Sequence, residues 1–332
     1  MRFRPPLVVL VALTAMLMPA YAKDRTDRDI PFKLKQGHFI VVEGTLGELT
    51  GRHFVIDTGV APTMLDAGIA AQLGLSGDQA HPIHAVMYDI DTIDMSLPSM
   101  TTGPIHVEGL PVIAADLSGL SKRIGVRVDA LVGLDVLGRS SFTIDYLDNT
   151  IRFGTPAPSA NQAALVREKY MVTVAMKVGQ APLQMLVDTG SPNLILFRNR
   201  IDIVSPASEI QHNKSNLGGK LLLTRVPAPT LRLGPAALDV EWAFLVDDPL
   251  VPATIDGLLG VSPQFFDWIA FDFERRLLSW QVRNPRIPPI TEAGSAPCPS
   301  AGDFGSMSWA PANASRGMNP CDSSTKGKFR PN

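Results

Sequence analysis

One short stretch occurs twice and decides the fold: Phe54-Val55-Ile56-Asp57-Thr58-Gly59 and, 131 residues later, Met185-Leu186-Val187-Asp188-Thr189-Gly190. The similarity continues upstream, where the paired segments are Phe39-Ile40-Val41-Val42 and Tyr170-Met171-Val172-Thr173. In each copy a polar turn separates two runs rich in β-branched and aromatic residues, a pattern typical of a β-hairpin. Each copy is therefore predicted to begin with a hairpin that carries Asp-Thr-Gly at the end of its second strand.

A second shared segment follows each aspartate and extends the repeat downstream. It consists of two apolar residues and a glycine, Leu131-Val132-Gly133 in the first copy and Leu258-Leu259-Gly260 in the second. A short helix is predicted after each segment, with Asp135 as N-cap in the first copy and Ser262-Pro263 as its start in the second. Apolar closing strands then complete the copies, at Thr150-Ile151-Arg152-Phe153 and Leu277-Leu278-Ser279-Trp280.

The repeat predicts a mainly β protein with two lobes, related by a pseudo-two-fold axis and separated by a cleft. Proline and small residues form a linker between the lobes, and few large apolar residues occur after about Asn284, a composition typical of disorder. The expected organisation is a signal peptide at 1–22, an N-terminal extension at 23–35, a first lobe at 36–154, a linker at 155–164, a second lobe at 165–284 and a disordered C-terminal tail at 285–332.

The N-terminus has the features of an export signal. Arg2 and Arg4 precede an apolar run at 7–18, and Pro19-Ala20-Tyr21-Ala22 has the small-x-small form of a cleavage site. A bilayer span needs about 20 apolar residues, so this run is too short for an anchor. We expect an exported protein, periplasmic or secreted, without stable membrane insertion. The extension at 23–35 is interpreted as a flexible N-terminus, with a removable pro-piece as the alternative.

The composition narrows the functional classes. Hydrophobic residues make up 45% of the 332 residues and the net charge is −2, which is typical of a globular protein without electrostatic attraction to nucleic acid or anionic lipid. The two cysteines, Cys298 and Cys321, lie in the predicted tail, and the sequence leaves open whether they form a disulfide.

Two groups of potential metal ligands lack the spacing of a metal site. They are the histidine pair His81 and His84, and the acidic group Asp89, Asp91 and Asp94. The first lacks partners for zinc, and the second lacks the glycine and terminal glutamate of a calcium loop. Both groups are interpreted as solvated side chains, and neither a metal nor an organic cofactor is expected.

Asp57 and Asp188 form a candidate catalytic pair. Amide hydrolysis needs one group that takes a proton from water and another that protonates the carbonyl oxygen. Two carboxyls about 3 Å apart do both when they share a proton, because like charges at that distance do not both ionise. Flanking glycines allow a tight turn, and flanking hydroxyls are expected to bond to the opposite loop. These supporting residues are Thr58, Gly59, Thr189, Gly190 and Ser191.

With these motifs the chain resembles the aspartic peptidase superfamily, whose retropepsin and pepsin families carry Asp-Thr-Gly-(Ser/Ala) and a second hydrophobic-hydrophobic-Gly motif. The resemblance covers residues 36–283, and the short lobes and the Gly-Leu-Asp-Val-Leu-Gly-Arg stretch at 133–139 are closer to retropepsin-like bacterial proteins. It implies a single-chain form with two mainly β lobes, a catalytic water on the two aspartates, and hairpin flaps that close over an extended peptide.

The flaps implied by this resemblance are expected around Met87-Tyr88-Asp89 and around Asn216-Leu217-Gly218-Gly219-Lys220. Gly218 and Gly219 suit a hairpin tip. Tyr88 is a candidate substrate contact, with an exposed loop aromatic as the equally good alternative.

One position departs from the family pattern. Val60 follows the first Asp-Thr-Gly, where the family has a small or hydroxyl residue, whereas Ser191 follows the second. A hydroxyl there hydrogen-bonds a carboxylate and favours its ionised form. The sequence therefore predicts an unequal pair, in which Asp188 is the more readily ionised member and Asp57 holds the proton.

The leading functional prediction is an aspartic endopeptidase that cleaves an extended polypeptide. One chain supplies both halves of the site, so no dimer is required. The alternatives are an envelope protein that binds peptides or other ligands with little or no turnover, and a narrow hydrolase of a non-protein amide such as a cell-wall peptide.

Overall fold

The computed structural model describes residues 28–283, except 78, 86–87, 169–170, 202–209 and 217–218. The predicted signal peptide, the tail with Cys298 and Cys321, and Gly218 therefore lie outside the described residues. Both copies of the repeat belong to one compact unit of the chain. In the described part, no helix has the length and apolar character needed to cross a membrane.

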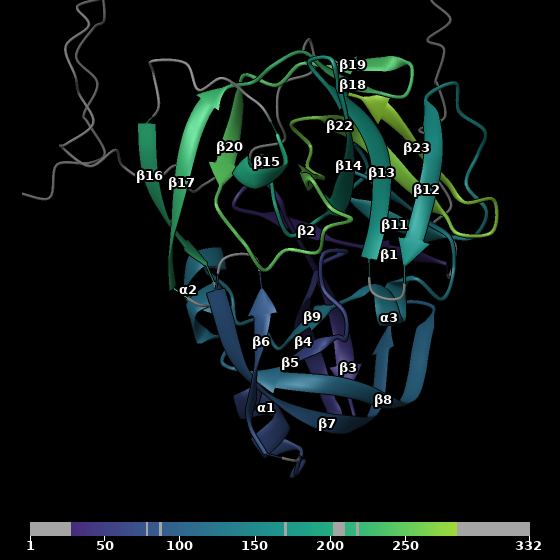
Figure 1. Ribbon diagram of the computed structural model, residues 1–332. Helices are drawn as coiled ribbons and strands as arrows, with labels where there is room; N and C mark the ends of the chain where they lie inside the picture. The colour runs from purple at the N-terminus through teal and green to yellow at the C-terminus, as the bar shows by residue number, and fades with distance from the viewer. Residues whose placement is uncertain are drawn as a thin grey trace, which may run out of the picture. The chain divides into compact units, whose positions relative to one another are not determined.

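The described part of the chain is mainly β and forms two sheets (Figure 1). The smaller sheet has eight strands, all from the first copy and the segment before it. Their order is β2 (Lys33–Lys35), β3 (Phe39–Leu46), β4 (Leu49–Ile56), β9 (Ala130–Val132), β5 (Met64–Asp66), β8 (Ile105–Ala115), β7 (Tyr88–Thr102) and β6 (His81–Ala85). This confirms the predicted fold class and places the strand that leads to Asp57 near the middle of a sheet.

The larger sheet has fifteen strands and contains the second copy together with three strands from the first part of the chain. Its main path is β1 (Asp29–Pro31), β11 (Thr150–Phe153), β10 (Phe142–Asp145), β22 (Phe266–Asp272), β23 (Leu277–Val282), β12 (Gln162–Glu168), β13 (Met171–Val178), β14 (Ala181–Asp188), β21 (Gly257–Gly260), β15 (Leu194–Phe197), β20 (Trp242–Val246), β17 (Gly219–Pro227) and β16 (Ile210–Asn216). Two further strands, β18 (Leu231–Leu233) and β19 (Ala236–Leu238), extend from β13.

The two copies repeat the same strand pairings. In the first, β4 runs parallel to β9, β9 is antiparallel to β5, and β5 is parallel to β8. In the second, β14 is parallel to β21, β21 is antiparallel to β15, and β15 is parallel to β20. The sequence repeat is thus a repeat of topology, in which each apolar-apolar-glycine segment is the strand beside an aspartate.

Helices are short and few among the described residues: α1 (Ala67–Gln72), α2 (Ser118–Ile124), α3 (Leu134–Leu137) and the 3-10 turn η1 (Arg198–Arg200). The helix expected after Gly133 is α3, but its N-cap is Gly133 and not Asp135. The Asp135 carboxylate instead accepts hydrogen bonds from the Thr63 N–H at 3.0 Å and the Thr63 hydroxyl at 2.8 Å. It therefore holds the loop that follows Asp57.

The helix predicted at Ser262-Pro263 is wrong. Ser262 O accepts from the N–H groups of Phe265 and Phe266, which closes one turn only, and β22 begins at Phe266. In the first copy, four residues separate α3 from β10. In the second, the three residues between Ser262 and β22 leave no room for a helix.

The N-terminal segment corrects a second prediction. The described part of the predicted extension, residues 28–35, forms β1 in the larger sheet and β2 in the smaller one. Its apolar side chains Ile30, Phe32 and Leu34 are buried, and burial of three such side chains stabilises this segment within the core. The linker predicted at 155–164 also ends earlier, because β12 begins at Gln162 and pairs with β23.

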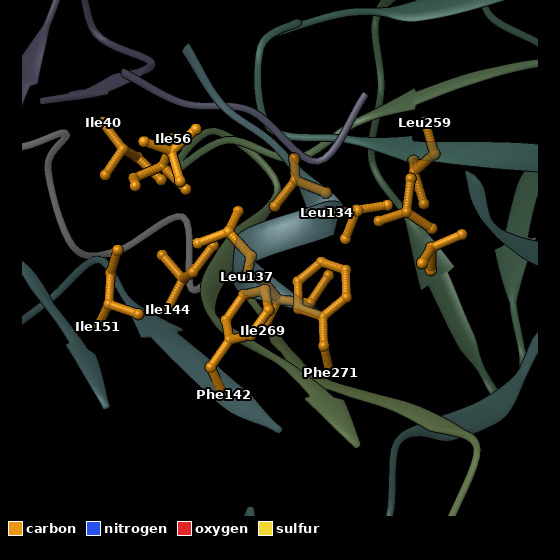
Figure 2. Packing of buried hydrophobic residues seen from close by; sticks show 14 of the residues in the cluster. Ile40, Ile56, Leu134, Leu137, Phe142, Ile144, Ile151, Leu259, Ile269 and Phe271 are labelled. Carbon is orange, nitrogen blue, oxygen red and sulfur yellow. The ribbon is translucent and has the colours of Figure 1, made fainter. Parts of the chain in front are cut away.

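One hydrophobic core contains side chains from both copies (Figure 2). The strands β10 and β22 pair so that Phe142 lies opposite Phe271, and their rings stack with centroids 4.7 Å apart. Tyr146 is fully buried at the end of β10, and its hydroxyl donates to Val261 O of the second copy at 3.0 Å. The last strands of the first copy are therefore packed into the second.

Candidate active site

Each aspartate of the repeat lies where a buried strand ends beside its parallel neighbour. Asp57 follows β4, and its N–H donates to Val132 O of β9 at 3.0 Å. Asp188 ends β14, and its carbonyl oxygen accepts from the Val261 N–H, just after β21, at 2.7 Å. The backbone of each aspartate is thus fixed to the neighbouring strand of its own copy, Asp57 through its N–H and Asp188 through its carbonyl oxygen.

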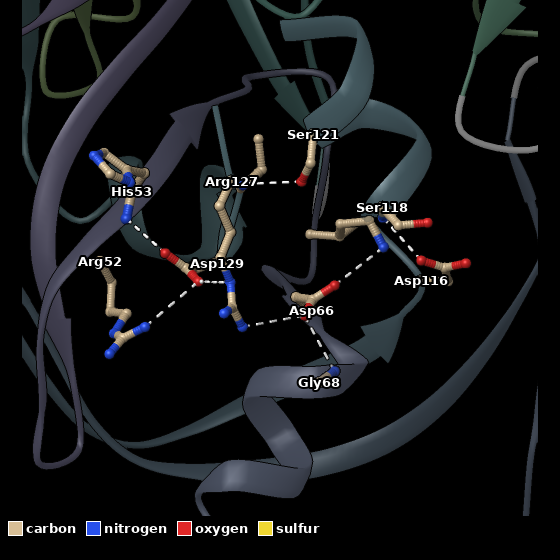
Figure 3. A network of polar contacts seen from close by, with 11 residues as sticks. Arg52, His53, Asp66, Gly68, Asp116, Ser118, Ser121, Arg127 and Asp129 are labelled. Carbon is tan, nitrogen blue, oxygen red and sulfur yellow. Dashed lines mark hydrogen bonds and ion pairs between the residues drawn. The ribbon is translucent and has the colours of Figure 1, made fainter. Parts of the chain in front are cut away.

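A second pair of aspartates fixes the start of each of these neighbouring strands. Asp129, which precedes β9, accepts from the His53 N–H at 2.8 Å, and Asp256, which precedes β21, accepts from the Gln184 N–H at 2.8 Å. Asp129 also forms an ion pair with Arg127, with 2.8 Å between Nε and Oδ1 (Figure 3). Sequence analysis missed this pair, although an aspartate two positions before each apolar-apolar-glycine segment is visible in the repeat.

The two aspartate loops are joined by a reciprocal set of buried hydrogen bonds. The Thr58 N–H donates to the Thr189 hydroxyl at 2.9 Å, and the Thr189 N–H donates to the Thr58 hydroxyl at 3.1 Å. Each hydroxyl then donates to a carbonyl of the opposite strand, Thr58 to Val187 O and Thr189 to Ile56 O. Both threonines are fully buried, so the predicted bonds between the loops are present and shielded from water.

The glycines bring the two carboxyls together. A Cβ at Gly59 would lie 2.8 Å from Asp188 Oδ1, and a Cβ at Gly190 would lie 2.7 Å from Asp57 Cγ. Each glycine therefore faces the carboxyl of the opposite copy at a distance that leaves no space for a side chain. Each also donates its N–H to the aspartate of its own loop, at 2.8 Å for Gly59 to Asp57 and 2.7 Å for Gly190 to Asp188.

The two carboxyls differ in proton affinity. Burial raises the pKa of Asp57 well above its ordinary value, and the neighbouring charge of Asp188 raises it further. Burial also raises the pKa of Asp188, but hydrogen bonds from the Gly190 N–H, from Asp57 and from the Ser191 N–H oppose that rise. The pKa of Asp57 is therefore the more strongly raised of the two, which is the direction that the sequence predicted.

The predicted cause of this inequality is wrong, because the Ser191 hydroxyl does not make the predicted bond. That hydroxyl accepts from the Asn193 N–H at 3.4 Å, while the Ser191 N–H bonds to the Asp188 carboxylate. At the equivalent position, the Val60 N–H bonds to the carbonyl oxygen of Asp57 at 3.3 Å. The Ser191 backbone N–H, and not its hydroxyl, is therefore one of the groups that oppose the rise in the pKa of Asp188.

A cavity of about 330 Å³ contains both aspartates. The first copy contributes Val55, Val60, Met64, Ile113 and Leu131, and the second contributes Leu186, Ile195, Leu223 and Leu258. The hairpin β6–β7 adds Ile83, His84, Ala85 and Ile90. The carboxyl pair thus lies in largely apolar surroundings, which accounts for the effect of burial on both pKa values.

The structure places the predicted flaps as follows. The first is the hairpin β6–β7, and Tyr88 is the first residue of β7, paired with Ala85. The described residues give no side-chain position for Tyr88, and Met87 lies outside them, so the substrate contact of Tyr88 stays a prediction. The second is the hairpin β16–β17, whose register pairs Asn216 with Gly219. Gly218 lies outside the described residues, so its place in this flap stays a prediction.

His84 and Arg123 also line this cavity, and sequence analysis assigned neither to the site. The solvated interpretation of His84 is wrong, because its ring contacts two carboxylates. Arg123 lies over the Phe39 ring, with 5.2 Å from its guanidinium carbon to the ring centroid. Nothing near either residue in the sequence signals its place, since both approach the cavity through tertiary packing.

Across the described ranges, no group of three or more His, Cys, Asp or Glu side chains is arranged to hold a metal ion.

The comparisons with known proteins cover the first copy. None of the curated proteins matches the chain. Residues 42–136, from β3 to α3, match the family model described as Aspartyl protease. This segment contains Asp57, Thr58, Gly59 and the strand β9. The part of the chain that carries the first Asp-Thr-Gly is therefore similar to the aspartyl proteases.

Proposed function

We propose that the protein is a two-lobed, retropepsin-like aspartic endopeptidase that hydrolyses peptide bonds with Asp57 and Asp188. One observation carries the proposal: the two carboxyls, one from each copy, meet in one cavity with unequal proton affinities. The similarity of residues 42–136 to the aspartyl protease family supports it. One chain supplies both carboxyls, so the site is complete without a second subunit.

The inequality assigns a role to each carboxyl. Asp188, ionised, takes a proton from water as the water oxygen bonds to the peptide carbonyl carbon, while Asp57 gives its proton to the carbonyl oxygen. The resulting diol collapses when Asp188 passes its proton to the leaving nitrogen and Asp57 regains a proton from a diol hydroxyl. The carbon–nitrogen bond breaks, and the pair returns to its starting state with one proton.

The cavity walls favour a polypeptide substrate. Apolar side chains from both copies flank the carboxyl pair, and the hairpin β6–β7 lines the same space. Burial of apolar substrate side chains against these walls supplies binding free energy and removes water around the reacting carbonyl. The positively charged and apolar N-terminal residues support export of the protein to the periplasm or the medium as part of the proposal.

A mixed peptide library tests the function. The protein is incubated with it from acid to mildly alkaline pH beside two variants, Asp57→Asn at the pair and Asp239→Asn, a matched change on an exposed residue of the second copy. Cleavage by wild type and Asp239→Asn but not by Asp57→Asn supports a peptidase. Saturable peptide binding without cleavage at any pH supports the rival binding protein, and cleavage confined to cell-wall peptides supports the narrower hydrolase.

A further inference from the structure

His84 connects the hairpin β6–β7 to the second copy of the repeat. It lies on β6, and its Nδ1 is 2.9 Å from Asp89 Oδ1 on the paired strand β7. Its Nε2 is 3.1 and 3.2 Å from the two carboxylate oxygens of Asp248, which follows β20. One imidazole thus bridges the hairpin and a strand end that is 164 residues away in the sequence.

The two carboxylates differ in their surroundings. The Asp248 side chain is 1% exposed and also accepts from the Leu250 N–H at 3.0 Å, so it is held in place within the second copy. The Asp89 side chain is 65% exposed and belongs to the same hairpin as His84. Of the two contacts, only the one to Asp248 fixes the hairpin to another part of the molecule. A contact to a buried carboxylate is also less screened by water and salt.

The position of His84 relates this bridge to the candidate site. His84 and its neighbours Ile83 and Ala85 line the cavity that contains Asp57 and Asp188. A hairpin that is held against Asp248 therefore keeps one wall of this cavity in place. Movement of β6 away from the second copy would expose the apolar walls and the carboxyl pair to water.

We propose that His84 is a positioning residue, which holds the hairpin β6–β7 against Asp248 over the carboxyl pair and releases it when the imidazole loses its proton. The kinetic consequence rests on the proposed peptidase function, whereas the bridge itself does not. The protonated ring donates from both nitrogens, one to each carboxylate, but the neutral ring has a single N–H and carries no charge.

The direction of the pH dependence follows from the groups around the ring. Burial lowers the pKa of His84, but the hydrogen bonds and charges of Asp89 and Asp248 together outweigh it and raise the pKa above the ordinary 6.5. The stabilising effect is therefore complete below that ordinary value and is lost as the pH rises through the raised pKa. The other charged groups near the bridge or lining the cavity are His81 with Asp94, Asp91, Arg198 with Asp247, Arg123, and the pair Asp57 and Asp188.

Amide hydrogen exchange tests the bridge without any substrate. Protection of the backbone amides at 81, 83–85 and 88–92 is measured below and well above the ordinary histidine pKa, each corrected for intrinsic exchange. In wild type we expect about tenfold lower protection at the higher pH. In His84→Ala, protection should be low at both pH values. In His84→Gln, whose amide still donates to Asp248 but does not titrate, protection should be intermediate and independent of pH.

His81→Ala is the matched control. His81 lies three residues earlier on the same strand, and its contact to Asp94 at 3.8 Å stays within the hairpin. This variant should keep the wild-type protection and its pH dependence. Equal loss of protection in His81→Ala and His84→Ala, or unchanged protection in His84→Ala, overturns the proposal whether or not the protein cleaves peptides.

Kinetics then connect the bridge to the reaction. For a cleaved peptide at acid pH, His84→Ala should raise KM about fivefold with a much smaller change in kcat. Asp248→Asn should give a similar rise, and the double variant should show no further effect because both changes remove one contact. Additive effects of the two changes, or an equal fall in kcat for both, contradict a positioning role.

Discussion

The Asp57 and Asp188 loops are alike in the threonine and glycine contacts that build the pair and unlike in one backbone contact to the carboxyl. Both end a buried strand, exchange threonine bonds with the opposite loop and bring a glycine against the opposite carboxyl. They differ at the third residue after the aspartate, where the Ser191 N–H bonds to a carboxylate and the Val60 N–H bonds to a carbonyl. A repeated scaffold thus gives its two carboxyls different hydrogen-bond partners at this position, and the Ser191 N–H is one of the groups that oppose the rise in the pKa of Asp188.

The largest effect on kcat is expected when either aspartate of the pair is replaced. Asp57→Asn and Asp188→Asn should each lower kcat about 10⁴-fold, because acid and base act as a unit and neither is useful alone. The measurement is peptide hydrolysis beside Asp239→Asn, which should keep wild-type activity. Substantial activity in only one of the two variants would show that the carboxyls do not share the reaction.

The next effect tests the equivalence of the threonines. Thr58→Val and Thr189→Val should each destabilise the protein by several kcal/mol, since each leaves buried partners unpaired at about 1–3 kcal/mol per group. The two losses should be equal within error in chemical denaturation, and Thr58→Ser and Thr189→Ser, which keep the hydroxyl, should lose far less. Clearly unequal losses would mean that the loops are joined less symmetrically than the bond lengths indicate.

A smaller effect is expected on the free energy of unfolding when Asp57 is replaced. Because the pKa of Asp57 is raised in the folded state, its contribution to stability is present at low pH and is lost as the pH rises through that raised value. Asp57→Asn does not ionise, so at neutral pH it should be more stable than wild type, by about 1.4 kcal/mol for each unit of the rise. Thermal unfolding at acid and neutral pH measures this. A variant that is less stable than wild type at neutral pH would contradict the buried charge.

The smallest effect is expected at positions 60 and 191, where the two loops differ, and concerns the pH–rate profile. Because the Ser191 hydroxyl is not among the groups that change the pKa of Asp188, Val60→Ser should leave both limbs of the pH–rate profile in place, and so should Ser191→Ala. A shift of a full pKa unit in either variant, about 1.4 kcal/mol, would restore the hydroxyl explanation. The profile itself should be bell-shaped, with activity between the lower and upper apparent pKa values of the pair.

The residues that the repeat made visible were the easiest to predict. The mainly β class, the hairpin before each aspartate and the bonds between Thr58 and Thr189 follow from local patterns that recur in register. The helix at Ser262 was wrong because strand β22 begins before one can form, which depends on pairing with β10 and β23. The burial of Ile30 in β1 depends on β11, more than a hundred residues away.

The contact between His84 and Asp248 also depends on residues that are far apart in the sequence, and local sequence patterns did not predict it. A histidine in a polar stretch is most often solvated, and the carboxylate that changes this interpretation, Asp248, lies in the other copy. Likewise, the direction of the Ser191 N–H depends on how its loop is fixed, which the side chains alone do not indicate. Sequence predicted the participants of the pair, whereas the contacts that tune it come from packing between the copies.

The pairing of β10 with β22 also orders events during synthesis of the chain. Asp57 is made early, but β10 and the Tyr146 hydroxyl lack their partners in the second copy until Val261 and residues 266–272 have left the ribosome. A domain fragment that ends before these residues has an open sheet edge and lacks part of the core that carries the second aspartate loop. The two carboxyls therefore meet as a fixed pair only when nearly the whole described chain is complete, so a half-made chain carries no working acid and base.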